Sequence, residues 1–157
     1  MRAGDIVFIK GDSWVSRIIR WFDKGEFTHV GVAITSLDLI EAQRFARVRI
    51  HPVGDVETAV PTDFLTEDER KRILSEAIDM IGTRYDYLQI FGYIIRKLFR
   101  REGSGRFNSP SKLICSELVS RALYKAGITS DADALYDLTP NQLYTYIEYL
   151  KEQRGDA

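Results

Sequence analysis

Short apolar segments separated by turn residues dominate the first third of the chain. They are rich in β-branched residues and occupy residues 6–9, 29–35, 39–45 and 48–50. Polar and glycine-containing turns, such as residues 35–38, lie between them. Short apolar runs bounded by such turns are typical of neighbouring antiparallel strands. We therefore expect a short buried strand at residues 6–9 and an antiparallel meander over residues 29–50.

Apolar residues recur at helical spacing in most of the remaining chain. The predicted helices cover residues 13–22, 66–81, 87–100, 111–126 and 141–151. The second has the clearest start, because Thr66 precedes Glu69 in the spacing of a capping box, and Gly82 follows its last apolar residue. Gly127 similarly predicts the end of the fourth helix.

Composition favours one ordinary folded domain spanning residues 1–157. Of these 157 residues, 45% are hydrophobic and 29% are charged. The 22 Lys and Arg residues are balanced by 23 Asp and Glu residues, so the chain has no overall basic field for nucleic acid, and we expect no nucleic-acid partner. One cysteine and two histidines can form neither an internal disulfide nor a four-ligand Cys/His zinc site. We expect no metal and no cofactor.

The hydrophobic pattern predicts neither a signal peptide nor a membrane span. Asp5 and Lys10 bound only a short apolar run near the N-terminus. The longest apolar stretch, residues 87–99, is interrupted by polar residues and is shorter than the roughly 20 residues that span a bilayer. These features predict a cytoplasmic protein.

Cys115 is the first candidate for chemistry. It lies near the start of the helix predicted from about Ser111, where free backbone N–H groups and the helix dipole favour an anion. A thiolate is the reactive form of cysteine, and a neighbouring imidazolium stabilises it. The alternative is that Cys115 is a small buried hydrophobe between Ile114 and Leu118.

His29 and Glu41 are candidates for the partners of that thiol. His29 begins an apolar strand, where a general base is plausible, and Glu41 is a carboxylate inside another apolar strand. A hairpin turning about Ser36 sets Glu41 opposite Gly31, on the same face as His29 and one strand step of roughly 7 Å away. His51 competes for the role of base, but it precedes Pro52 and is expected in a surface loop.

Five short motifs follow one another from Gly4 to Val119. They are Gly4-Asp5-Ile6-Val7-Phe8, Thr28-His29-Val30-Gly31-Val32, Ile40-Glu41-Ala42, Gly82-Thr83-Arg84-Tyr85-Asp86 and Ile114-Cys115-Ser116-Glu117-Leu118-Val119. Together they resemble the ordered motifs of the circularly permuted papain-like hydrolases, which are YiiX-like relatives of the NlpC-type cell-wall endopeptidases. The resemblance extends to about Leu143. In the ordinary NlpC arrangement the cysteine precedes the histidine, so the order seen here is the one that permutation produces.

The resemblance implies an α+β, papain-like fold, with an antiparallel sheet packed against helices, which agrees with the order of the predicted elements. It implies that Cys115 is the nucleophile, His29 the general base and Glu41 the residue that orients the imidazole. Tyr85 matches a tyrosine that lines the cleft. Asp5 matches an early Gly-Asp pair, and we expect its carboxylate to fix the turn before the first strand.

The implied reaction is acyl transfer through an acyl-thioenzyme, with the Cys115 backbone N–H as an expected oxyanion donor. The implied substrate is a cell-wall-type peptide amide or a lipid or acyl conjugate, and the missing signal peptide argues against the wall. The apolar residues 88–99 lead into a basic segment that could hold an acyl chain and an anionic head group in peripheral contact with a membrane. The alternatives are a core-packing helix with a solvated basic end and, for the whole protein, a non-catalytic lipid- or peptide-binding module on the same fold. The basic residues are Arg96, Lys97, Arg100, Arg101 and Arg106.

Overall fold

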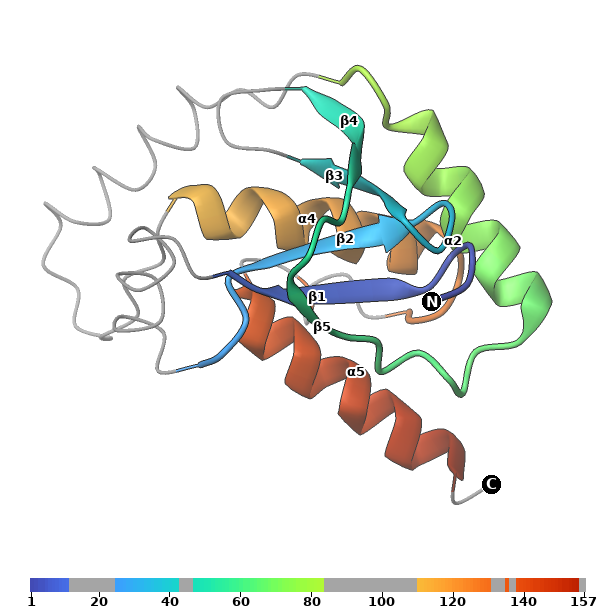
Figure 1. The fold of residues 1–157 in the computed structure, drawn as a ribbon. Coiled ribbons are helices and arrows are strands. Elements are labelled where there is room, and N and C mark those ends of the chain that lie inside the picture. Colours follow the sequence, from blue (N-terminus) through green and yellow to red (C-terminus); the bar gives the residue numbers. More distant parts are fainter. Residues whose placement is uncertain (12–24, 43–46, 84–109, 131–134, 136–137, 156–157) are drawn as a thin grey trace, which may run out of the picture.

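The computed structural model describes residues 1–11, 25–42, 47–83, 110–130, 135 and 138–155. They form a five-stranded sheet with helices packed against it (Figure 1). The strands are β1 (Ile6–Lys10), β2 (His29–Ala33), β3 (Asp38–Ala42), β4 (Val48–Pro52) and β5 (Glu57–Ala59), in the spatial order β4-β3-β2-β1-β5. All neighbouring strands pair antiparallel. The predicted α+β class and the meander from β2 to β4 are confirmed.

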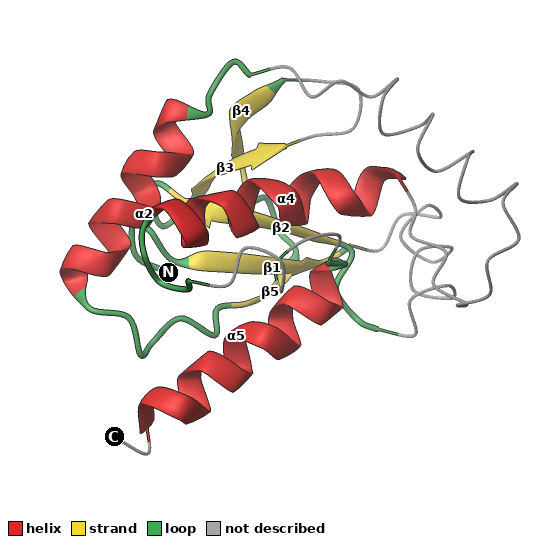
Figure 2. Ribbon diagram, turned by 180° about the vertical axis from the view of Figure 1, so that it is seen from behind, coloured by secondary structure: helices red, strands yellow, loops and turns green. Residues whose placement is uncertain are grey.

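Three helices lie in the described part of the chain: α2 (Glu67–Asp79), α4 (Pro110–Lys125) and α5 (Pro140–Gly155). Helix α4 crosses the sheet in front of β2 when the molecule is seen from behind (Figure 2). It contacts β2 and β3 on the sheet and both other helices. The helices predicted at 13–22 and 87–100 lie outside the described residues.

The alternation of buried residues along the strands explains this packing. Ile6 and Phe8 of β1, and Val30 and Val32 of β2, join one core cluster with Leu118 and neighbouring residues of α4. A smaller cluster, containing Val7, Ala33 and Leu39, is made by residues of the opposite parity. Because side chains alternate between the faces of a strand, both faces of the central strands carry apolar residues.

The predicted ends of two helices are confirmed by their hydrogen bonds. Thr66 caps α2: its hydroxyl accepts from the backbone N–H of Glu69, and the Glu69 carboxylate accepts from the N–H of Thr66. Gly127, at φ +70°, follows α4, and the next residue, Ile128, donates its N–H to the carbonyl of Leu123 at 3.0 Å. No helix in the described ranges is long and apolar enough to cross a membrane.

Two strand predictions were wrong. His51 was expected in a loop after Ile50, but β4 continues through His51 and Pro52, which pair with Leu39 and Asp38. Proline is tolerated there because it ends a strand at the edge of the described sheet. The short β5 was not predicted, because three residues give too little alternation to reveal a strand.

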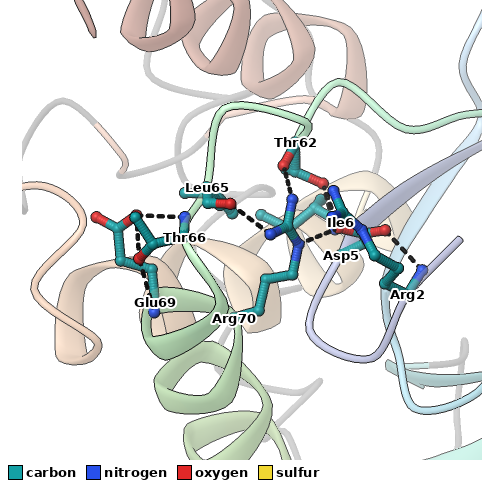
Figure 3. A network of polar contacts seen from close by, with 8 residues as sticks. All are labelled: Arg2, Asp5, Ile6, Thr62, Leu65, Thr66, Glu69 and Arg70. Carbon is teal, nitrogen blue, oxygen red and sulfur yellow. Dashed lines mark hydrogen bonds and ion pairs between the residues drawn. The ribbon is translucent and has the colours of Figure 1, made fainter.

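The turn before β1 is fixed by a buried ion pair that the sequence did not reveal (Figure 3). Asp5 accepts the backbone N–H of Arg2 at 2.7 Å, which confirms its expected role in the turn. Its other oxygen accepts from Nε of Arg70 at 2.7 Å, and both side chains are almost fully buried. Arg70 also donates to the backbone carbonyls of Thr62 and Leu65. The pair therefore ties α2 to the entrance of the sheet.

Candidate active site

Three of the predicted site residues come from separate elements. His29 is the first residue of β2, Glu41 is the fourth of β3, and Cys115 lies on α4. The register between β2 and β3 pairs Val32 with Ile40, as expected for a hairpin turning about Ser36. The predicted register is therefore confirmed at Val32–Ile40 and Ala33–Leu39.

His29 and Glu41 form a close contact. Nε2 of His29 lies 2.7 Å from Oε2 of Glu41, the distance of a charge-assisted hydrogen bond. The Glu41 side chain is only 7% exposed, whereas that of His29 is 24% exposed. The imidazole therefore has one nitrogen bound to a buried carboxylate and its other nitrogen, Nδ1, left for a second partner.

That second partner is Cys115. Burial lowers the pKa of His29, but the negative charge of Cys115 and its hydrogen bond to the ring outweigh burial. The hydrogen bond and charge of Glu41 act in the same direction, and together these interactions raise the pKa of His29 from 6.5 to about 10. Since Nε2 is held by Glu41, we assign Nδ1 to the thiol. The imidazole therefore lies between the carboxylate of Glu41 and the sulfur of Cys115.

Glu41 remains ionised in spite of its burial. Burial raises the pKa of this carboxyl, but the hydrogen bond and charge of His29 outweigh it, and His51 and Arg49 add smaller contributions. The pKa of Glu41 is therefore below its ordinary value. A carboxylate that stays charged at neutral pH can fix the orientation of the ring and stabilise its protonated form.

Cys115 lies deeper in α4 than the sequence indicated. The helix begins at Pro110, so Cys115 is in its second turn, where a regular helix pairs its N–H with the carbonyl of Ser111. The expectation that this N–H serves as an oxyanion donor is therefore wrong. Cys115 is fully buried and belongs to the main core cluster. Burial also agrees with the alternative interpretation of Cys115 as a small core residue.

Two polar contacts hold the elements that carry the site. The side chain of Asn141, at the start of α5, accepts from the N–H of Phe27 and donates to its carbonyl, both at 2.9 Å. This double contact fixes the backbone two residues before His29. Ser116, next to the cysteine, donates its hydroxyl proton to the carbonyl of Leu138 and so ties α4 to the segment before α5. Neither contact was predicted, because each joins residues that are distant in sequence.

The other predicted site residues lie outside the part of the chain that the structure describes. Tyr85 and the basic residues Arg96, Lys97, Arg100, Arg101 and Arg106 are outside the described ranges. Among the residues that are described, no group of three or more His, Cys, Asp or Glu side chains is arranged to hold a metal ion.

Comparison with known proteins identifies the fold. No family model matches the chain, and no curated protein matches it in sequence. A similar solved structure is that of the metalloprotein YiiX from Escherichia coli O157:H7, DUF1105. The match has a TM-score of 0.54 at 19% sequence identity and covers 82% of this chain and 67% of that one. The chain therefore has a YiiX-like α+β fold, an antiparallel sheet packed against helices.

Proposed function

We propose that this protein is a papain-like cysteine hydrolase in which Cys115 is the nucleophile, His29 the general base and Glu41 the residue that orients the imidazole. One observation carries the proposal: His29 lies between a buried carboxylate at 2.7 Å and the protein's single cysteine. A thiol hydrogen-bonded to a base, with the base oriented by a third group, is the arrangement that activates a nucleophile.

The reaction follows from this arrangement. The Cys115 sulfur attacks the carbonyl carbon of an amide or ester, and the bond to the leaving amine or alcohol breaks as that group takes a proton from His29. The acyl group then remains on sulfur as a thioester. Water attacks the thioester, His29 accepts the water proton, and the acid product departs as the thiol group is restored. Glu41 holds the ring throughout and stabilises its charged form.

The substrate class rests on the resemblance of the five ordered motifs to those of the permuted papain-like hydrolases. It favours a wall-type peptide amide or a lipid or acyl conjugate, and the apolar segment with its basic end favours the lipid or acyl class. The metal character of YiiX is not carried over, because the described residues of this chain offer no group of metal ligands. The proposed chemistry uses the thiol and the imidazole.

A non-catalytic binding module is the second candidate. The observation that favours it is the complete burial of Cys115 within the core cluster. In such a module the thiol would be protonated and inert, as buried cysteines in apolar surroundings are. In the hydrolase it would be a thiolate paired with His29 at neutral pH. The charge state of one sulfur therefore separates the two functions.

Two measurements on the single cysteine test that charge state. The ultraviolet absorbance of a thiolate, taken as wild type minus Cys115→Ala over a pH series, reports ionisation without requiring access to the sulfur. The rate of alkylation by iodoacetamide reports both ionisation and access. The hydrolase predicts a thiolate at pH 7 and an alkylation midpoint well below about 8.5, the value of a free thiol. A protonated thiol at pH 7, with slow labelling at all pH values, would support the module.

Matched variants then test the roles in catalysis. We expect Cys115→Ser, Cys115→Ala and His29→Ala to lose nearly all hydrolysis of a small soluble thioester or ester, while His51→Ala has a mild effect. Lys71→Ala removes an exposed charge on α2 and serves as the control for general effects of substitution. Hydrolysis that survives in both cysteine variants would remove Cys115 from the role of nucleophile.

A further inference from the structure

Glu41 uses only part of its hydrogen-bonding capacity in the contact with His29. Oε2 binds the imidazole, but Oε1 is buried and has no hydrogen-bond partner among the described residues. A buried carboxylate oxygen without a donor is costly, so native proteins usually supply one. The nearest potential donor, the imidazole of His51, is therefore a candidate partner for Oε1 of Glu41.

His51 supplies the adjacent group. Its Nδ1 lies 3.8 Å from Oε1 of Glu41 and 2.8 Å from the carbonyl of Pro52. The β3–β4 register pairs Glu41 with Arg49 and Leu39 with His51, so the carboxylate and the imidazole share a face of the sheet. The His51 side chain is 44% exposed and can exchange protons with solvent. A small rotation of the ring would turn its N–H from the carbonyl toward Oε1.

We propose that His51 is a positioning residue that acts on His29 through Glu41. The two imidazoles take opposite oxygens of one carboxylate: His29 binds Oε2, and His51, when protonated, is drawn to Oε1. The protonation of His51 thereby sets how strongly Glu41 holds His29. The inference rests on the proposed function only in taking Cys115 as the group whose reactivity His29 controls.

The sign follows from the charges around the carboxylate. Besides His51, Glu41 faces His29 from β2 and Arg49 from β4, and His29 in turn contacts Cys115 from α4. When two cations bind one carboxylate, each weakens the interaction of the other with that carboxylate. Protonation of His51 therefore favours the neutral pair of thiol and imidazole over the ion pair. The reactivity of Cys115 should therefore be lower when His51 carries its proton.

Two substitutions fix the charge of His51 in opposite states. His51→Gln keeps a polar group that does not titrate, and we expect Cys115 to remain reactive at lower pH than in the wild type. His51→Lys keeps a positive charge across the range, and we expect twofold to tenfold slower alkylation at pH 8, which matches coupling of up to about one pH unit. Lys71→Gln, which removes an exposed cation from α2, should leave the profile unchanged.

A double-mutant cycle tests whether the effect passes through Glu41. In a Glu41→Gln background, His51→Gln should change the alkylation profile by less than about twofold, because the shared carboxylate is gone. An equal effect of His51→Gln in both backgrounds would overturn the proposal, as would a profile that neither His51 variant changes.

Nuclear magnetic resonance of the two imidazoles separates this inference from the proposed function. In the wild type the ring signals of His29 should show a secondary step when His51 titrates, and that step should vanish in His51→Gln. If the step is present while Cys115 proves unreactive, the coupling stands and the hydrolase fails. If Cys115 is reactive and the step is absent, the hydrolase stands and the role of His51 is refuted.

Discussion

The stabilisation of protonated His29 predicts a specific loss of stability at alkaline pH. The pKa of His29 rises from 6.5 to about 10 in the folded protein. Because the folded state binds this proton more tightly than the unfolded state, its contribution is complete below about pH 6.5 and is lost as the pH rises through about 10. At 1.36 kcal/mol per pH unit, the shift of His29 alone corresponds to an upper limit of about 5 kcal/mol. A thiolate at Cys115 offsets part of this amount, because below about pH 8.5 the folded protein then binds one proton fewer at sulfur than the unfolded chain does.

Urea unfolding, followed by circular dichroism from pH 6.5 to 10 with a thiol reductant present, measures this loss. The comparison is made in proteins that lack the Cys115 thiol: Cys115→Ala should lose more stability across that range than Cys115→Ala/His29→Gln, by less than about 5 kcal/mol, because only Glu41 then raises the pKa of His29. The difference removes the titration of lysines and tyrosines common to both proteins. Glu41 remains bound to the ring in Cys115→Ala. The wild type should differ from this variant: with the proton of Cys115 on His29, its folded and unfolded states bind equal numbers of protons between about pH 6.5 and 8.5, so its loss should begin only above about pH 8.5.

One result would refute the reasoning. If the pH dependence of Cys115→Ala and of Cys115→Ala/His29→Gln agreed to within about 1 kcal/mol, Glu41 would not hold His29 in its protonated form in the folded state. Should the double variant fail to fold, the comparison between wild type and Cys115→Ala still tests the pairing of Cys115 with His29. Equal slopes for those two proteins would remove Cys115 as a cause.

Three further predictions concern other parts of the molecule. Glu41→Gln should retain some activity with a lowered kcat and an altered pH profile, because Glu41 orients His29 without touching substrate; a variant identical to the wild type would exclude that role. Arg70→Met should lower the free energy of unfolding by about 3–5 kcal/mol in urea titrations, because it leaves Asp5 buried without its cation, and Asp5→Asn combined with Arg70→Met should recover part of the loss. If the basic segment binds acylated substrates, replacing three of its arginines by glutamine should weaken binding to anionic vesicles or raise KM for an acyl substrate. The kcat for a small ester should change little. Unchanged vesicle binding and KM, together with cleavage of a short wall peptide by the wild type, would favour a peptide amidase. The three residues replaced are Arg100, Arg101 and Arg106.

Local features of the fold could be predicted from the sequence because their causes are local. The capping box of Thr66 and Glu69 depends on residues three apart, and Gly127 ends a helix by its own backbone freedom. The β2–β3 register follows from a short turn about Ser36, which brings Glu41 to the same face as His29. The contact between these two side chains was therefore foreseeable from spacing within one hairpin.

Contacts between distant parts of the chain were decided by the tertiary structure. Packing of α4 against β2 and β3 brings Cys115 to His29. Because no local spacing links the two residues, that pairing could be predicted only through a resemblance to known proteins. His51 lies beside Glu41 because β4 continues through His51 to Pro52. In the sequence, the proline after His51 indicated a loop at this position. The Arg70–Asp5 pair and the Asn141–Phe27 contact likewise join segments that meet only after the core has formed. Hydrophobic patterning determines which faces are buried, but it does not determine which polar groups meet at the edges of those faces, because that depends on how the helices dock on the sheet.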